Sequence, residues 1–520
     1  MKKFDRVEII KNVGSSWFAL GVNVVVGIFL SPYILHRLGD EAFGLWVLIF
    51  SITGYYGLFD LGIRSSIVRY VAKYSATHDY EQLNRLINTA MASYSGVGAV
   101  ALLVTLSGVL SLASIFHISA SFLSTARLLF LMVGTAVSLG FPLGVFGGIL
   151  EGLQRFYLMN LTSVSSTLLR AGLIVLALRQ GAGLLTVAFI TVSLPLLAAM
   201  VNATVVLHRV PLRFSARYVE RNSLRQIANY SGATFMIILA SRLRFKTDAM
   251  VIGTFLSSAA ITYFAIGSRL VDYAGEVVNS LAQIFVPMSS QSDATGDMDR
   301  LRKIFVAGNR ACALIIFPIA ACLGILGKSV IEAWVGRRYV AISYPVLLVL
   351  LIPSTFMLAQ AASARTLFGM AKHKTLAVVT LMEGVANLIL SIVLVRRFGI
   401  LGDAVGTAIP LTCTTLWFLP RHLCRVLGLR VRTYLREAFM LPFGLTLPLI
   451  AVLLLLRHWY IAHNYLQLAV QLLLGSSVYG LGLLWAVWSH KAWQVEGIQD
   501  EETARATAMA LVETYQQEEA

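Results

Sequence analysis

The sequence predicts an all-α polytopic membrane protein with about 14 transmembrane helices, arranged as two six-helix lobes followed by two C-terminal helices. Three observations lead to this prediction. The chain of 520 residues is 57% apolar and only 13% charged, with a mean hydropathy of +0.76, whereas soluble domains have about 45–50% apolar and about 25% charged residues. The apolar residues form long blocks, and the basic residues gather between those blocks on one side.

The apolar blocks are long enough to cross a bilayer, which requires roughly 20 mostly apolar residues per helix. Breaks that contain charged or turn-forming residues separate the blocks. The expected spans lie near residues 13–36, 42–63, 86–112, 127–149, 157–178, 183–207, 230–256, 258–287, 304–327, 343–364, 374–395, 401–423, 435–456 and 464–489. A composition of this kind excludes a soluble enzyme, a disordered regulator and a disulfide scaffold.

The distribution of basic residues predicts the topology. With the N-terminus inside, the inner connections hold about three times as many lysines and arginines as the outer ones. Two inner connections are rich in arginine, at residues 208–229 and around residues 421–436. The bias predicts that both termini lie inside, and it accounts for the net charge of +16 without a nucleic-acid partner.

Internal similarity predicts the domain organisation. Residues 152–178 align without gaps to residues 369–395, and "LGDEAFGLWVL" (38–48) resembles "LSSAAITYFAI" (256–266) at nearly the same shift. Each match spans an even number of helices, which is typical of a parallel repeat with its axis along the membrane normal. The predicted parts are an N-terminal lobe (1–207), a basic linker (208–229), a C-terminal lobe (230–424), two further helices (425–490) and an acidic cytoplasmic tail (491–520) that contains a short amphipathic helix.

Motifs for catalysis and for metal binding are absent from the sequence. The nine histidines are scattered and form no HExxH pair, and the outer connections are too short for an external catalytic domain. The sequence therefore predicts a protein that is not an enzyme and that binds neither a metal nor a cofactor.

Charged residues at membrane depth are the candidate functional residues, because each costs about 2.5–3.5 kcal/mol to insert and needs a partner or a watery cavity. The expected helix 230–256 carries Arg242, Arg244, Lys246 and Asp248. At 100° per residue, Arg242 and Lys246 share one face of a continuous helix, and Arg244 and Asp248 share the opposite face. The second pair can neutralise itself, whereas the first presents two like charges that require an anion.

Other charged residues of the expected spans complete a predicted cavity, mainly in the C-terminal half. Three of them form a stripe along one helix face, at positions i, i+3 and i+7. The set comprises Arg269, Asp272 and Glu276 of that stripe, together with Arg170, Arg310 and Glu383. Structural ion pairs between helices are the alternative interpretation of Arg244, Asp248, Arg269 and Asp272. Arg242 and Lys246 favour a functional interpretation.

One segment resembles a known family. The stretch "LGDEAFGLWVLIFSITGYYGLFDLGIRSSIVRYVA" (38–72) is similar to the N-terminal signature of bacterial polysaccharide exporters, the flippases of O-antigen and other lipid-linked oligosaccharides. The matching pieces are "LG…AFGLW", "GLFDLGI" and the basic "VRYVAKY". These flippases share a superfamily with multidrug and toxic-compound extruders (MATE) and with the lipid II flippase. The resemblance implies a MATE-like, V-shaped arrangement of two lobes.

The resemblance also implies a function. It implies that an undecaprenyl-pyrophosphate-linked oligosaccharide passes from the cytoplasmic to the periplasmic leaflet of the bacterial inner membrane by alternating access, coupled to an inward flux of H⁺ or Na⁺. The implied partners are that substrate, membrane lipids and the polymerase or assembly proteins of the polysaccharide. Our candidates for pyrophosphate binding are Arg242, Lys246, Arg244, Arg170 and Arg310, and those for ion coupling are Asp272, Glu276, Glu383 and Asp248.

Alternative functions remain open at this point. An extruder of cationic drugs would need an acidic cavity, whereas the candidates comprise six cations (Arg269 included) and four carboxylates. A lipid II flippase is a second alternative, although basic residues, which that branch tends to use in its first helix, are absent from 13–36. A glycan polymerase or ligase would need an essential outer-loop residue such as Lys328, Arg337 or Arg338. A non-transporting scaffold would leave the buried charges unexplained.

Overall fold

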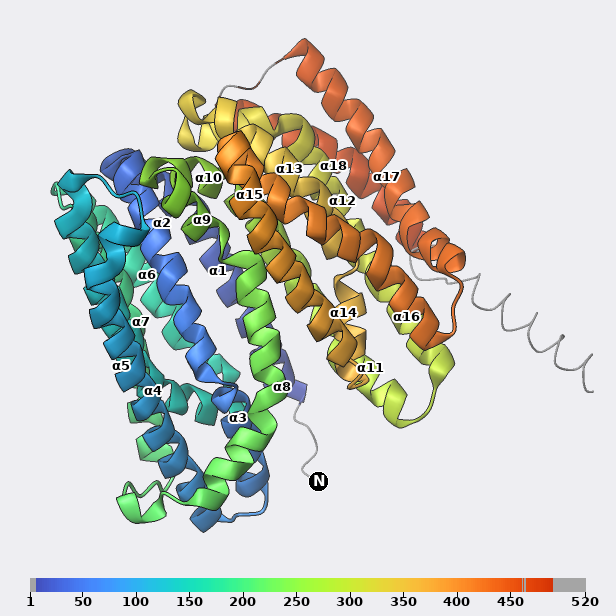
Figure 1. Cartoon of the computed structure of the whole chain (residues 1–520). Helices are drawn as coiled ribbons and strands as arrows, with labels where there is room; N and C mark the ends of the chain where they lie inside the picture. The colour runs from blue at the N-terminus through green and yellow to red at the C-terminus, as the bar shows by residue number, and fades with distance from the viewer. Residues whose placement is uncertain (1–5, 461, 463, 490–520) are drawn as a thin grey trace, which may run out of the picture. The chain divides into compact units, whose positions relative to one another are not determined.

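Long apolar blocks fold into helices throughout the computed structural model, which describes residues 6–460, 462 and 464–489 (Figure 1). Within these residues there is no β-strand, which confirms the predicted all-α fold class. The predicted acidic tail with its amphipathic helix lies outside the described residues.

The described chain divides into two units, each built from more than one stretch of sequence. The first unit contains the residues up to Ala265 together with Gly384–Asp403. Its helices are α1 (Arg6–Leu38), α2 (Asp40–Gly54), η1 (Tyr55–Asp60), α3 (Ile63–Ala76), α4 (Tyr80–Ile115), α5 (Ala120–Gly152), α6 (Phe156–Arg179), α7 (Leu184–Arg209), η2 (Ala216–Tyr218), α8 (Arg221–Phe245) and α9 (Asp248–Phe255). In this unit α5 packs against α4 and α7, and α6 packs against α1 and α7.

The second unit contains Ile266–Glu383 and the residues from Ala404 onward. Its helices are α11 (Phe285–Ala294), α12 (Met298–Val335), η3 (Arg337–Tyr339), α13 (Val340–Ala359), α14 (Ala361–Gly369), the π-helical segment η4 (Cys413–Phe418), α16 (Leu419–Leu427), α17 (Val431–Trp459) and α18 (Tyr465–Trp488). The long helix α12 packs against α13 and α17, and α17 packs against α18. Two helices contribute to both units, α10 (Ser258–Ala282) and α15 (Lys374–Thr412).

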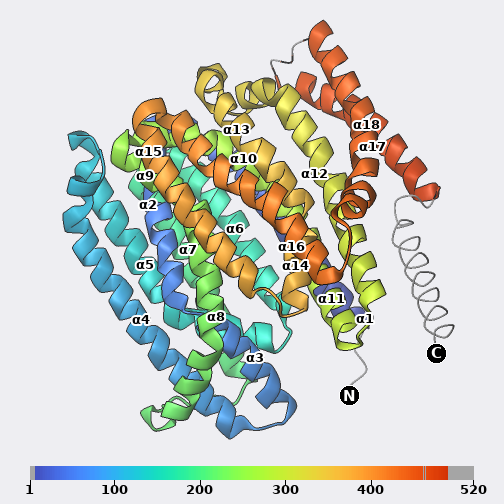
Figure 2. The same ribbon diagram turned by 45° about the vertical axis from the view of Figure 1, so that its right-hand side comes forward.

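Eleven helices among the described residues are long and apolar enough to cross a membrane. One of these elements, Lys374–Leu427, has 54 residues and would be about 80 Å long if it were straight. It turns back at Gly399, whose φ of 57° is left-handed, and the Ser391 hydroxyl lies 3.3 Å from the Asp403 carbonyl oxygen (Figure 2). Its two arms correspond to the predicted spans 374–395 and 401–423. Helices α8 and α10 carry predicted charged residues and are not among the eleven, so the count of 14 spans stays a prediction.

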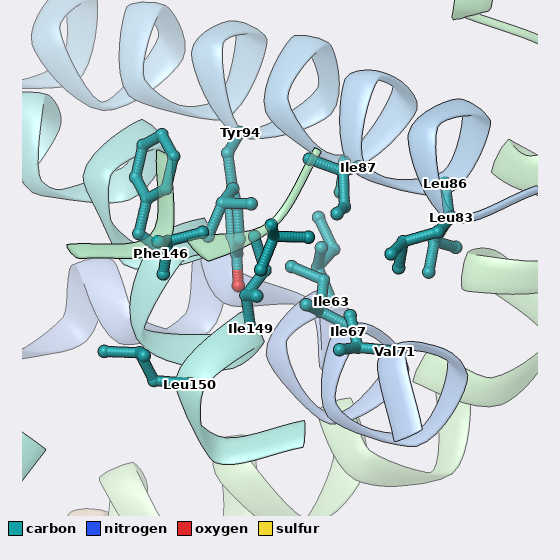
Figure 3. Packing of buried hydrophobic residues seen from close by; sticks show 14 of the residues in the cluster. Ile63, Ile67, Val71, Leu83, Leu86, Ile87, Tyr94, Phe146, Ile149 and Leu150 are labelled. Atoms are coloured by element: carbon teal, nitrogen blue, oxygen red, sulfur yellow. The ribbon is translucent and has the colours of Figure 1, made fainter. Parts of the chain in front are cut away.

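The core at one end of the first unit explains part of the signature segment. Figure 3 shows Ile63, Ile67 and Val71 of α3 packed with side chains of α4 and α5. Left-handed Leu61 and Gly62, with φ of 49° and 79°, turn the chain from η1 into α3. At this turn the Asp60 carboxylate accepts hydrogen bonds from the Tyr94 hydroxyl and from the Arg64 backbone N–H. The "GLFDLGI" piece therefore fixes the direction of the amphipathic helix α3.

The two segments of the shorter internal match lie against one another within the first unit. A Cβ atom added to Gly44 of α2 would lie 1.7 Å from the Ser258 carbonyl oxygen. The Thr262 hydroxyl donates to the Asp40 carbonyl oxygen at 2.6 Å, and the Tyr263 hydroxyl lies 3.5 Å from the Asp40 carboxylate. Only glycine at position 44 permits this approach of α2 to the start of α10.

Substitution of Gly44 by alanine is expected to destabilise the protein by about 1–3 kcal/mol or more, because the added methyl group meets backbone atoms that have no room to move. The measurement is the thermal unfolding midpoint of the purified protein in detergent. Gly54→Ala in the same helix is the control, since its Cβ would have no atom within 4 Å. Equal midpoints for the two variants would show that the close approach is not required.

Candidate functional site

The candidate site lies where the chain breaks between α8 and α9. The prediction of one continuous helix over 230–256 is wrong, because α8 ends at Phe245, Lys246 has non-helical angles (φ −127°, ψ 4°) and a new helix begins at Asp248. No glycine or proline marks this break. The Thr247 hydroxyl donates to the Leu243 carbonyl oxygen at 2.7 Å. A side-chain hydroxyl thus competes for a carbonyl oxygen that accepts a backbone N–H in a regular helix.

The break changes the expected arrangement of the four charged residues. The Lys246 backbone N–H still donates to the Arg242 carbonyl oxygen at 3.0 Å, but the non-helical φ of Lys246 removes the regular spacing on which their shared face was predicted. Arg244 and Asp248 stand on opposite sides of the break, so the prediction that they share a helix face is wrong as well. All four residues remain within one short stretch of the first unit.

The 3₁₀ segment η1 lies against this break. The Tyr55 hydroxyl lies 2.7 Å from the Thr247 hydroxyl and donates to the Arg242 carbonyl oxygen at 3.3 Å. The Arg242 guanidinium lies over the backbone of Gly57, where an added Cβ would be 2.7 Å from a terminal nitrogen. The segment 38–72, which resembles the family signature, therefore contacts Arg242, one of the charged residues predicted to be functional in 230–256.

Arg242 is half-buried, and no hydrogen bond or ion pair to its guanidinium is found among the described residues. Lys246 is exposed and has no ion-pair partner in the same part of the chain. A half-buried arginine that forms no ion pair is expected to attract an external anion or water. The geometry at the α8–α9 break therefore suits an anion.

The hairpin of α15 brings a second group of polar side chains to α8. The Asn387 side-chain amide donates to the Arg244 carbonyl oxygen at 3.3 Å, and the Ser391 hydroxyl donates to Asn387 Oδ1 at 2.9 Å. Across the turn from Ser391 lies Asp403, whose side chain is fully buried and receives no hydrogen bond on either carboxylate oxygen from the described residues. Asp248 lies near enough for the two carboxylates to repel one another when both are ionised.

Asp403 was absent from the sequence-based candidates. The signal was present, because the residue is a single carboxylate at the start of the apolar block 401–423. A carboxylate near the end of a predicted span is ordinarily exposed. The reversal at Gly399 instead places it inside the first unit. A buried carboxylate without hydrogen bonds is a candidate for protonation or for cation binding.

The predicted stripe on α10 is present, and it contains an ion pair. Arg269 lies 3.9 Å from the Asp272 carboxylate and stacks 4.7 Å from the centroid of the Tyr273 ring. Glu276 lies close enough to act electrostatically on both Arg269 and Asp272. The charge of Arg269 is therefore balanced on its own helix, whereas the structural interpretation expected ion pairs between helices.

The remaining two predicted residues of this group, Arg170 and Glu383, lie on α6 and α15. Arg170 of α6 is half-buried, with no ion pair among the described residues. Glu383 is buried within α15, one residue before the stretch that belongs to the first unit. Both residues stay predictions as ligands of substrate or coupling ion.

Arg310 has a partner that the sequence did not reveal. Its guanidinium lies 3.3 Å from the Glu437 carboxylate and donates from Nε to the Glu437 carbonyl oxygen at 2.7 Å. Both side chains are largely buried, with 4% and 13% exposed. This pair joins α12 to α17, and it accounts for the charge of Arg310 without an anionic ligand.

Comparisons with known proteins agree with this architecture. The profile of the family described as "Polysaccharide biosynthesis protein" matches residues 9–293. A "Putative O-antigen transporter" of Shigella flexneri is 21% identical over 81% of this chain and 99% of its own length. The lipid II flippase MurJ, solved in an inward closed conformation, superposes with a TM-score of 0.69 at 14% identity over 93% of this chain and all of its own.

A multidrug resistance transporter of the MATE family and the MOP superfamily, solved in an inward-facing conformation, has a TM-score of 0.62 at 14% identity over 78% of this chain and 94% of its own. At this identity the two solved structures bear on the fold alone, and both are transport proteins rather than enzymes. More than half of the chain matches the family profile. This multi-pass membrane protein, with a fold like that of MurJ and the MATE transporters, therefore belongs to the polysaccharide biosynthesis protein family.

Proposed function

We propose that this protein moves an undecaprenyl-pyrophosphate-linked oligosaccharide from the cytoplasmic to the periplasmic leaflet of the bacterial inner membrane by cation-coupled alternating access. Family membership supports the role in polysaccharide biosynthesis, and the name of the Shigella flexneri relative, a putative O-antigen transporter, supports a glycan as the transported group. The excess of basic residues in the inner connections supports cytoplasmic N- and C-termini.

The assignment of a pyrophosphate-linked substrate rests on the surroundings of Arg242. A pyrophosphate is too strongly charged to cross hydrocarbon without compensating cations. The Arg242 guanidinium is half-buried and forms no ion pair among the described residues, so a phosphate group would supply a negative partner through bidentate hydrogen bonds. Lys246 follows at the end of the same helix and adds a second positive charge. Arg244 and Arg170 are further candidates in the same unit.

The position of Arg242 also distinguishes between the proposed function and its alternatives. A cavity for cationic drugs would place a carboxylate where Arg242 lies. Lipid II also carries a pyrophosphate, so a lipid II flippase would use the same cations to bind it. Lipid II and the proposed lipid-linked oligosaccharide therefore differ only in the glycan that the protein would recognise. A glycan polymerase would require substrate turnover.

We assign the coupling step to carboxylates, with Asp248 and Asp403 as the favoured pair, because the two carboxylates repel one another when both are ionised. Two neighbouring carboxylates in a buried site resist being ionised together, so a proton or Na⁺ stabilises the pair. The pair lies in the unit that contains Arg242, and Asn387 contacts the backbone of Arg244. Binding of a cation to the two carboxylates would therefore change the position of the α8–α9 break. Asp272, Glu276 and Glu383 remain the other candidates for coupling.

Simultaneous replacement of Arg242 and Lys246 by alanine is expected to lower the rate of translocation at least about tenfold, since two charge-assisted contacts to phosphate are lost. The measurement uses proteoliposomes that contain lipid-linked oligosaccharide with a labelled glycan, and follows how fast the label becomes accessible on the opposite leaflet. Arg217→Ala is the matched control, because Arg217 is an exposed cation of the linker.

Normal transport by the double variant would assign both cations a structural role. Translocation of lipid II in preference to every other lipid-linked glycan would favour the lipid II alternative. A wild-type protein that translocates no lipid-linked glycan, but exports cationic drugs, would overturn the proposed function.

A further inference from the structure

Gly57 is the point at which the signature segment contacts the proposed anion site. A Cβ atom added to Gly57 would lie 2.7 Å, 3.3 Å and 3.4 Å from the Nη2, Cζ and Nε atoms of Arg242. All three atoms belong to the guanidinium group. The bare backbone of Gly57 therefore forms a seat on which the guanidinium lies.

The seat is held at a defined position relative to α8. The Tyr55 hydroxyl joins η1 to both sides of the break, through the Thr247 hydroxyl on one side and the Arg242 carbonyl oxygen on the other. The backbone of Arg242 and the backbone of Gly57 are thereby linked through a residue two positions away from Gly57. No hydrogen-bond acceptor of the guanidinium is found among the described residues, so the contact with Gly57 is the constraint on its position that the structure shows.

We propose that Gly57 is a positioning residue for substrate binding: its missing side chain seats the Arg242 guanidinium in the orientation that binds pyrophosphate. The inference rests on the proposed function, since it assumes that Arg242 meets the pyrophosphate. It gives the glycine of "GLFDLGI" a role that differs from that of Asp60 in the same motif. Asp60 directs α3, whereas Gly57 directs a side chain of α8.

A methyl group at position 57 is expected to move the guanidinium and to leave the fold intact. The clash is with the far end of a long flexible side chain, which relocates at little cost, rather than with backbone. Gly57 does not have positive φ, so alanine adopts its backbone conformation without strain. The expected consequence is a misplaced ligand for the anion, not an unfolded protein.

The test is a set of dissociation constants for farnesyl pyrophosphate, measured by calorimetry on the purified full chain in detergent. Farnesol, which lacks the pyrophosphate, measures the apolar contribution. We expect Gly57→Ala and Arg242→Ala each to weaken binding of farnesyl pyrophosphate about tenfold, with farnesol binding unchanged. Gly54→Ala is the matched control, because its Cβ would meet no atom within 4 Å.

The decisive comparison is the double variant. If Gly57 acts only through Arg242, adding Gly57→Ala to Arg242→Ala weakens binding by less than about twofold, because the interaction is already lost. If the two substitutions weaken binding of farnesyl pyrophosphate independently, so that their effects add in the double variant, the proposal is overturned. It is also overturned if the Gly57→Ala variant binds farnesyl pyrophosphate as tightly as wild type. If wild type binds farnesyl pyrophosphate and Gly57→Ala binds it equally well, the inference about Gly57 fails, but the proposed function is not contradicted.

Two other outcomes are also decisive. If Gly57→Ala fails to fold but folds when combined with Arg242→Ala, the clash with Arg242 is supported. If neither variant folds, the glycine serves the backbone alone and the proposal is overturned. If wild type does not distinguish farnesyl pyrophosphate from farnesol, both the anion site and the inference built on it are overturned.

Discussion

Replacing Arg310 with alanine is expected to lower the free energy of unfolding by about 3–5 kcal/mol, because the change leaves a buried Glu437 carboxylate without its cation. Arg310 is 4% exposed, and it contacts both the carboxylate and the backbone carbonyl oxygen of Glu437. The variant would therefore lose the polar link between α12 and α17. The thermal unfolding midpoint of the purified protein in detergent measures the effect.

Arg64→Ala is the control for this experiment. Arg64 pairs with Glu151 at 3.2 Å, but the two side chains are 47% and 31% exposed, and such pairs contribute about 0–1 kcal/mol. The double variant Arg310→Met with Glu437→Leu is expected to recover most of the midpoint, because it removes both charges together. A stable Arg310→Ala variant that no longer binds farnesyl pyrophosphate would instead assign Arg310 to the substrate, as the sequence predicted.

Replacing Asp403 with asparagine is expected to abolish the stimulation of transport by an ion gradient. The carboxylate is fully buried, receives no hydrogen bond from the described residues and lies near Asp248. Asparagine keeps the size of the side chain and removes the group that binds a proton or Na⁺. Proteoliposomes with and without an imposed H⁺ or Na⁺ gradient give the ratio of rates, which we expect to fall to about one.

Protein stability separates this effect from damage to the fold. Removal of an uncompensated buried carboxylate is expected to leave the thermal midpoint unchanged or to raise it. Asp299→Asn serves as control, because this carboxylate is exposed and pairs with Arg302 on the same helix. Full gradient stimulation in Asp403→Asn, with loss in Asp272→Asn, Glu276→Gln or Glu383→Gln, would transfer the coupling role to those carboxylates.

Much of the fold follows from local properties of the sequence. The apolar blocks predict helices because burial in lipid and the hydrogen-bonding demand of the backbone leave few other solutions. The reversal between the two arms of α15 was predictable from the break at residues 396–400, where Gly399 supplies a left-handed φ. The stripe of Arg269, Asp272 and Glu276 was predictable because it depends only on the periodicity of one helix.

The break between α8 and α9 was not predictable in the same way. A helix that ends at Phe245 without glycine or proline depends on hydrogen bonds made by Thr247 and by Tyr55, a residue distant in sequence. The pairing of Arg310 with Glu437 and the burial of Asp403 likewise depend on tertiary contacts. The sequence indicated which residues carry unusual charge, whereas the partners of those charges came from the structure.

The composition of the first unit has a consequence for the biogenesis of the protein. That unit needs Gly384–Asp403, which the ribosome makes only after the 118 residues from Ile266 to Glu383. Helices that have already entered the membrane must therefore wait, incompletely packed, until most of the chain has been synthesised. Cutting the gene within the linker 208–229 would not yield a self-sufficient N-terminal half, since such a fragment would lack both α9 and the α15 hairpin. Membrane insertion of this chain is expected to proceed segment by segment, while its packing finishes late.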